Sequence, residues 1–230
     1  MAERWKIVAL CLNLTFLAVL TGCNRSGEGG GATTASIGSA NGTSPLEGMT
    51  SKSGLRRADM DSQHPLVQIE TSLGNITVQL DAVNAPLTVE NFLSYVNAGQ
   101  YDQTLVHQIY QGQGFLAGGY GLNWLERPSR TPIRNEANNG LKNRRGTIAM
   151  VRRPDAIDSA TCQFFINVAD NATLDFHDRT AEGYGYCVFG EVKEGLDIVD
   201  AIGRAAVHNT AEFDRTPVSP IAVKAIRQVR

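Results

Sequence analysis

The sequence lacks the features that mark several common classes of protein. Its 21 Lys and Arg residues nearly balance 23 Asp and Glu residues, and the net charge of -2 gives no electrostatic case for binding nucleic acid. Its most apolar stretch, Ile7–Leu20, is shorter than the about 20 residues that a membrane-spanning helix needs. The four cysteines show no metal-ligand spacing, so no metal site is predicted.

The short apolar stretch instead predicts a signal peptide. Basic residues stand at positions 4 and 6, the apolar segment follows, and Leu20–Cys23 (LTGC) closes it with small residues before a cysteine. This ending resembles the bacterial lipobox, in which the cysteine is diacylated and becomes the mature N-terminus. We therefore expect residues 1–22 to be a lipoprotein signal peptide and Cys23 to carry lipid. An ordinary signal peptide followed by a chance cysteine is the alternative.

Residues 23–64 are rich in Gly, Ser, Thr and Ala and contain almost no large apolar side chains. Such a segment buries too little surface to offset its ordering entropy, so we expect a disordered, lipid-anchored linker. The folded domain is then 65–230, long enough for one core. We expect a monomer in the cell envelope, attached to the membrane only through its N-terminal lipid and facing the periplasm or exterior.

Apolar and polar residues alternate in several short segments of this domain, which is typical of half-buried strands. Strands of this kind are expected at Leu66–Glu70, Asn75–Asp81 and Ile221–Val229. Short apolar runs bounded by turn residues predict buried strands at Thr147–Val151 and Phe164–Val168, and further strands are expected at Tyr101–Tyr110 and Tyr186–Val192. Two segments have helical periodicity: one opens at Pro86 and ends near Gly99, and the other is Gly195–Ile202. Many short strands with two separated helices predict a mainly β protein with a closed barrel.

Gly112–Gly121 is rich in glycine, and we expect it to cross between elements rather than to form a strand. No Lys-Ser/Thr pair follows it and no helix start is evident, so it is a poor phosphate-binding motif. No nucleotide or other cofactor is expected.

Three segments in order carry a resemblance to a known family: NEANNGLKN (135–143), RGTIAMVRRPDAIDSATCQFFIN (145–167) and GYCVFGEV (185–192). They resemble the cyclophilin peptidyl-prolyl isomerases, their bacterial branch in particular, and the similarity extends from about Val67 to Val229. It implies a closed barrel of eight antiparallel strands capped by two α-helices. It also implies an enzyme that isomerises X–Pro bonds without a cofactor.

The resemblance also assigns site residues, and the match is mixed. The family's His-Arg pair falls on His107-Gln108, so the histidine is kept and the catalytic arginine becomes Gln108. Downstream the resemblance assigns substrate binding to Gln163 (peptide backbone), Phe165 (floor of the proline pocket), Leu174 (its wall), Tyr186 (a pocket His position), and Val151 and Arg152 (a rim strand). Arg130, Arg152 or Arg153 would have to reach in from the rim to replace the missing cation.

The alignment of residues 111–119 is open at this stage. Without gaps, the family's pocket Phe-Met falls on Gln113-Gly114 and a second backbone-binding Gln falls on Leu116. A slip by two residues would bring Phe115 to the pocket position, which is chemically the more sensible arrangement. Neither alignment restores the arginine.

Cys162 and Cys187 flank two predicted strands. An oxidising compartment would permit a disulfide between them, whereas burial would keep them as two free thiols. The sequence does not decide between these states.

Two functions from different classes follow. The first is a prolyl isomerase of reduced activity that assists the folding of exported proteins by acting on their X-Pro segments. The second is a non-catalytic module or holdase that binds proline-containing segments, because Gln108 and Leu116 weaken catalysis and backbone binding together. A structural envelope lipoprotein with neither property is a third hypothesis.

Overall fold

The structure is a computed structural model that describes residues 62–229. The predicted signal peptide, Cys23 and nearly all of the predicted linker lie outside the described residues. Among the residues described, no helix is both long enough and apolar enough to cross a bilayer.

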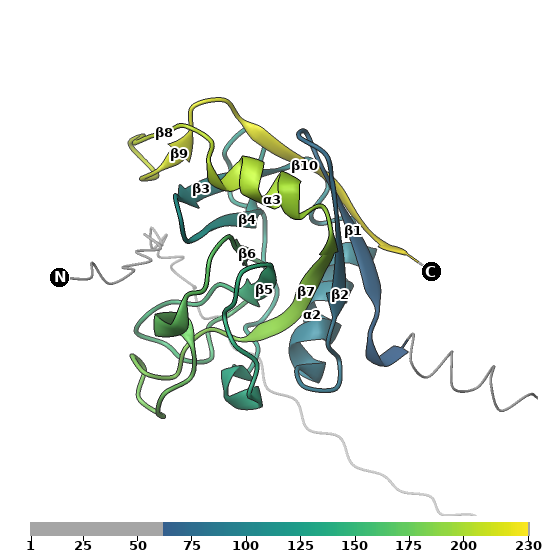
Figure 1. Ribbon diagram of the computed structural model, residues 1–230, viewed down its shortest axis with the longest axis vertical. Coiled ribbons are helices and arrows are strands. Elements are labelled where there is room, and N and C mark those ends of the chain that lie inside the picture. The colour runs from purple at the N-terminus through teal and green to yellow at the C-terminus, as the bar shows by residue number, and fades with distance from the viewer. Residues whose placement is uncertain (1–61, 230) are drawn as a thin grey trace, which may run out of the picture.

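Eight antiparallel strands close into a barrel, in the order β1-β10-β3-β4-β6-β5-β7-β2 (Figure 1). Their bounds are β1 Leu66–Thr71, β2 Asn75–Leu80, β3 Thr104–Tyr110, β4 Gly114–Gly121, β5 Thr147–Met150, β6 Phe164–Asn167, β7 Val188–Glu194 and β10 Ile221–Val229. A separate two-stranded ladder joins β8 (Val207–His208) to β9 (Thr216–Pro217), and short 3-10 helices form at η1 (Ala137–Asn139) and η2 (Ala172–Leu174). The predicted mainly β barrel with two capping helices is confirmed.

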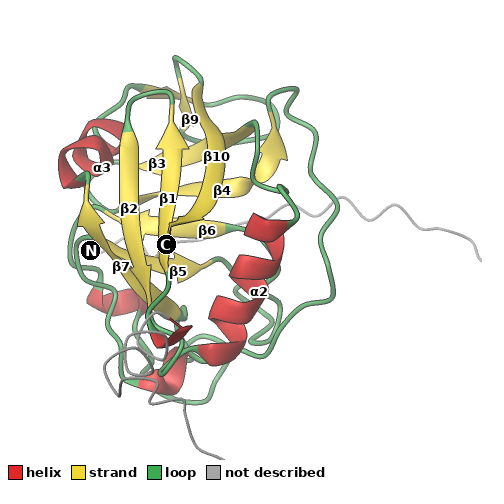
Figure 2. Cartoon of the chain, turned by 90° about the vertical axis from the view of Figure 1, so that its right-hand side faces the viewer, coloured by secondary structure: helices red, strands yellow, loops and turns green. Residues whose placement is uncertain are grey.

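Helices α2 (Pro86–Asn97) and α3 (Leu196–Gly203) lie at opposite ends of the barrel (Figure 2). Pro86 is well suited to the first turn of α2, where a backbone N–H has no helical partner. Glu136 accepts hydrogen bonds from the backbone N–H groups of Leu87 and Thr88, at 3.2 and 2.9 Å, and so satisfies two donors at this helix start.

The main core fills the barrel and extends under both helices. Phe92 of α2 is fully buried, and its ring centroid lies 5.2 Å from that of Tyr101, 5.6 Å from Phe164 and 5.2 Å from Phe189. Val199 and Ile202 close the core on the α3 side. The apolar spacing that predicted each helix therefore marks the face that it buries.

The expectation for Gly112–Gly121 was wrong, because residues Gly114–Gly121 form strand β4 between β3 and β6. Glycine is usually depleted in strands, but here it permits close packing. A Cβ at Gly118, whose φ is +89°, would lie 2.7 Å from the Tyr101 ring. The short strands β8 and β9 were also missed, since two-residue ladders leave no periodic pattern.

Cys162 and Cys187 are both buried and both free. Burial raises the pKa of the Cys187 thiol to about 12 and raises that of Cys162 as well. The two-thiol alternative is therefore the one that the structure adopts.

We predict that Phe92→Ala lowers the free energy of unfolding by about 3–5 kcal/mol, because it removes a ring packed on three others. Urea unfolding of both proteins measures the difference. Leu87→Ala is the matched control, since Leu87 lies on the same helix and is 45% exposed. Equal losses for the two variants would contradict the role given to Phe92.

Candidate functional site

A second apolar cluster lies on the outer face of the barrel, separate from the main core. We call it the outer-face cluster, and its buried members are Tyr110, Leu116, Ala149, Val151, Phe165, Leu174, Tyr186 and Val188. Strand alternation explains the two clusters, because successive side chains point to opposite faces of a sheet. In β6, for example, Phe164 and Ile166 belong to the main core and Phe165 to the outer face.

The strand register places the centre of this cluster. Gln108 of β3 lies opposite Leu116 of β4, Leu116 opposite Phe165 of β6, and Phe165 opposite Ala149 of β5. One row of side chains thus runs across four strands from a polar amide to an apolar floor. The Phe165 ring meets the Tyr186 ring edge to face, with centroids 5.7 Å apart.

Buried amide side chains hold Leu174 beside this floor. Asn143 Nδ2 donates to the Leu174 carbonyl at 3.0 Å, and the backbone N–H of Tyr186 donates to the same oxygen at 2.9 Å. Asn167 Nδ2 in turn donates to Asn143 Oδ1 at 3.3 Å. The loop that carries Leu174 is therefore fixed to β6, so the apolar wall and floor keep one relative position.

Gln163 stands at the edge of the cluster, half-buried, directly before β6. Its side chain lies across Gly119, where an added Cβ would come within 2.6 Å of Gln163 Cγ. The Gln163 carbonyl accepts from the backbone N–H of Val151 at 2.9 Å, which ties the two predicted backbone-binding segments together. The missing side chain at Gly119 is thus what leaves room for this amide.

His107 lies behind Gln163 and is buried among rings. Its ring centroid is 4.9 Å from that of Tyr120 and 5.7 Å from that of Phe213. Burial lowers the pKa of His107 to about 4, although hydrogen bonds with the Leu105 backbone and the Gln163 side chain act to raise it. The imidazole is therefore neutral at pH 7, and its hydrogen bond supports the Gln163 side chain.

Gln108 is half-exposed at the other end of the row, and its Nε2 donates to the Asp214 carbonyl at 3.2 Å. This neutral donor stands where the resemblance places an arginine. Two residues further along β3, Tyr110 lies opposite Gly114 and joins the outer-face cluster. Tyr110 was not predicted to be a site residue from the sequence. Its spacing of two residues from Gln108 on a predicted strand is the signal that could have found it.

The structure also bears on the placing of residues 111–119. The register pairs Gln108 with Leu116 and Tyr110 with Gly114. Phe115 pairs with Ile109 and packs in the main core, so its assignment to the pocket was wrong. Gln113 stands at the pocket Phe position instead, and its Oε1 is buried without a hydrogen-bond partner among the described residues.

Backbone carbonyls hold the Arg152 side chain, contrary to the direct role in substrate binding that the resemblance assigned to it. It is buried and donates to the carbonyls of Gly185 at 2.8 Å and Ala181 at 2.7 Å, with its guanidinium over the Tyr186 ring at 5.0 Å. Burial lowers its pKa from the usual arginine value. Arg152 thus fixes the 181–185 loop and the ring of Tyr186, while Val151 itself lies in the outer-face cluster.

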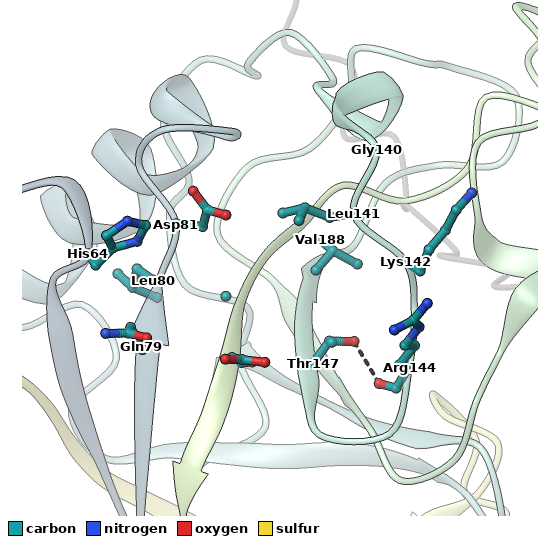
Figure 3. A pocket seen from close by; sticks show the side chains of 12 residues that line it. His64, Gln79, Leu80, Asp81, Gly140, Leu141, Lys142, Arg144, Thr147 and Val188 are labelled. Carbon is teal, nitrogen blue, oxygen red and sulfur yellow. Dashed lines mark hydrogen bonds between the residues drawn. The ribbon is translucent and has the colours of Figure 1, made fainter.

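A cavity of about 350 Å³ adjoins this face, between β2, β7 and the 140–144 loop (Figure 3). Val188 and Leu141 border both the cavity and the outer-face cluster. His64 and Gln79 line one side of it, and Lys142 and Arg144 the other. Because Asp81 and Glu191 also line it, its charges are mixed and indicate no single class of ligand.

The described residues contain no group of three or more His, Cys, Asp or Glu side chains arranged to hold a metal ion. The outer-face cluster offers an apolar floor and wall, a fixed amide at Gln163 and a weaker donor at Gln108. The chemistry of these side chains matches a small apolar ring with a polar backbone beside it.

Comparisons with known proteins all point to one family. The family model described as cyclophilin type peptidyl-prolyl cis-trans isomerase/CLD matches residues 66–228. The chain is 41% identical over 164 residues to peptidyl-prolyl cis-trans isomerase A of Dickeya dadantii, covering 71% of this chain and 84% of that protein. It is 40% identical over 161 residues to peptidyl-prolyl cis-trans isomerase B of Escherichia coli, covering 70% and 98%.

Solved structures show a similar fold. A crystal structure of a cyclophilin-type peptidyl-prolyl cis-trans isomerase from Cryptosporidium parvum matches with a TM-score of 0.59 at 20% identity, covering 73% of this chain and 98% of that one. A structure of the same protein in the presence of the dipeptide Ala-Pro matches with a TM-score of 0.58 at 21% identity, covering 72% and 99%.

We predict that His107→Gln reduces the amount by which the free energy of unfolding falls as the pH is lowered. The pKa of His107 falls from 6.5 to about 4 on folding, so the unfolded chain binds this proton more readily and stability drops as the pH falls below 6.5. Between pH 7 and pH 4 the wild type should lose up to about 3 kcal/mol through this residue. Urea unfolding at both pH values measures it, with His208→Gln, at an exposed histidine, as the control. Equal pH slopes for wild type and His107→Gln would contradict the assignment.

Proposed function

Because the chain belongs to the family of cyclophilin-type peptidyl-prolyl cis-trans isomerases, we propose that it isomerises X–Pro bonds at the outer-face cluster. The observation that carries the proposal is the row Gln108–Leu116–Phe165, with Leu174 and Tyr186 beside it on the outside of the barrel. These apolar side chains lie on the outer face of the barrel, so packing in the main core does not explain why they cluster. A proline ring is an occupant of matching chemistry.

The chemistry requires no nucleophile, metal or proton carrier. Rotation about an X–Pro amide has a barrier of about 18–20 kcal/mol and takes tens to hundreds of seconds without assistance. The twisted amide has lost its conjugation, so its prolyl nitrogen is a better hydrogen-bond acceptor than in the planar state. A donor aimed at that nitrogen stabilises the transition state more than the ground state.

The side chains divide this work. Phe165 and Leu174 hold the proline ring, and the Gln163 amide binds the peptide backbone next to it. Packing of Gly119, His107 and Val151 around Gln163 keeps that amide in place. A fixed backbone lets the peptide bond rotate while the rest of the segment stays bound.

We expect lower turnover than an enzyme with arginine at position 108 would have. Gln108 offers a neutral NH₂ donor on a shorter stem, and charge-assisted hydrogen bonds are roughly twice as strong as neutral ones. Leu116 also stands where a second backbone-binding amide would be, so the peptide is held by fewer hydrogen bonds.

The second candidate, a module that binds proline segments without turnover, rests on the same two residues. If Gln108 and Leu116 remove both the catalytic donor and part of the backbone contact, the apolar pocket alone remains. The pocket would then bind proline-containing segments and release them unchanged.

We further propose that the enzyme acts on exported proteins from a lipid anchor in the cell envelope. The support is in the sequence: a basic start, a short apolar segment and a cysteine at the end of LTGC. A single polypeptide tether from Cys23 would keep the groove close to chains that emerge at the membrane surface.

The isomerase proposal predicts exchange catalysis that depends on the floor of the pocket. In NMR exchange spectroscopy on an X-Pro peptide, the full-length chain should accelerate interconversion, Phe165→Ala should abolish it, and Gln108→Arg should raise it. Peptide shifts without faster exchange would show the binding module instead. If the peptide shows neither chemical-shift changes nor faster exchange, both candidate functions are contradicted, provided that the unfolding transition of each variant is intact.

The anchor proposal predicts a change in partition for Cys23→Ser. The wild-type chain, expressed in a bacterium with its own signal sequence, should enter the detergent phase on Triton X-114 separation because it carries acyl chains. Cys23→Ser should move to the aqueous phase or keep its uncleaved leader. An unlipidated wild-type chain by mass spectrometry would contradict the anchor.

A further inference from the structure

A cation near the prolyl nitrogen would be a stronger donor than Gln108. The three arginines named for this role from the sequence are held elsewhere. Arg152 is buried against the 181–185 loop. The Arg130 guanidinium lies over the Tyr95 ring at 5.1 Å and donates to the Ser94 carbonyl at 3.2 Å. Arg153 lies 3.7 Å from the carboxylate of Asp155.

A fourth arginine, Arg215, lies at the outer-face cluster, in the loop between β8 and β9. Its guanidinium carbon lies 4.8 Å from the centroid of the Tyr110 ring, and the residue is exposed. Tyr110 belongs to the outer-face cluster and follows Gln108 by two residues on the same strand face, a spacing of about 7 Å. The guanidinium therefore lies over a ring two residues along β3 from Gln108, the position where the family's arginine is missing.

The backbone at Arg215 is fixed on both sides. Its N–H donates to Asn209 Oδ1 at 3.0 Å, and its carbonyl accepts from the Ile109 N–H at 2.9 Å. Its φ of +60° is left-handed, a region that residues other than glycine occupy when their surroundings determine it. The loop is thus bound to β3 at the residue between Gln108 and Tyr110.

Neighbouring contacts fix the same loop to residues of β3 and β4. Phe213 packs on His107 and Tyr120, with ring centroids 5.7 and 4.7 Å apart, and the Gln108 side chain donates to the Asp214 carbonyl. Gln108 therefore contacts the loop that carries Arg215. A donor held in this way loses little freedom when it acts, which is the condition for electrostatic stabilisation of a transition state.

The ring beneath Arg215 is neutral and forms no ion pair with the guanidinium. Burial raises the pKa of Tyr110, so the phenol is neutral at physiological pH and presents a π-face rather than a phenolate to the guanidinium. Asp214 is exposed on the same loop, and no ion pair joins its carboxylate to Arg215 among the contacts of the described residues.

From these contacts we infer that Arg215 is a catalytic residue that donates to the prolyl nitrogen of the twisted amide, in place of an arginine at position 108. This inference rests on the proposed isomerase function. No bond is made or broken: the C–N bond rotates, the nitrogen lone pair accepts an N–H hydrogen bond, and the proton stays on the guanidinium. Gln108 then has a second role, since it holds the loop that presents the donor.

The test compares catalysis with binding in single and double variants. Exchange spectroscopy on an X-Pro peptide gives turnover, and chemical-shift titration of the same peptide gives the Kd. For the full-length chain, Arg215→Gln should reduce turnover by about 10²-fold or more while the Kd stays near the wild-type value. Arg215→Lys should retain part of the turnover, because it keeps the charge without the planar fork.

Gln108→Arg should raise turnover more in the Arg215→Gln background than in the wild type, because the two guanidinium groups serve one function. Arg204→Gln changes an exposed arginine directly after α3; it is the charge-matched control and should leave turnover unchanged. Thermal unfolding of each variant separates loss of catalysis from loss of fold, and Arg215→Ala supplies a second substitution if the first is unstable.

Wild-type turnover in Arg215→Gln would overturn the inference and leave the isomerase function standing. A weaker Kd with unchanged turnover at saturation would also overturn it, since Arg215 would then only help to bind the peptide. A wild-type chain that shows no catalysis would overturn the proposed function and this inference together.

Discussion

The floor of the outer-face cluster depends on the two-residue alternation of side chains in four neighbouring strands. β3, β4, β6 and β5 are buried on both faces, so each supplies the main core with one set of residues and the outer face with the other. A shift by one residue in any of these strands would exchange the two sets. The pocket floor at Phe165 and the core residues on either side of it are therefore specified by a single register.

The sequence predicted the fold well because the alternation is visible in it. Val67 and Ile69, or Ile76 and Val78, show the buried face of a strand without reference to any relative. Phe165 and Leu174 were assigned through a family resemblance, and the structure places both in one cluster. The two main failures have different physical causes: in β4 the glycines hide the strand, and at position 115 a suitable side chain stands on the core face.

Other parts of the site were beyond the reach of sequence patterns. Arg152 was expected at the rim because its neighbours are there, but carbonyls of a distant loop bind its side chain. Arg215 lies more than one hundred residues from Gln108, in a loop without periodicity, and only the contact with β3 brings the two together. Loops positioned by a rigid scaffold commonly carry functional groups in this way.

The two buried thiols bear on how the domain itself becomes folded. Neither Cys162 nor Cys187 has a partner sulfur, and their raised pKa values leave little thiolate to react. A domain built in this way reaches its native state without an oxidant and without reshuffling of wrongly paired cysteines. It is therefore ready to work on other chains in either redox environment, independent of the machinery that oxidises them.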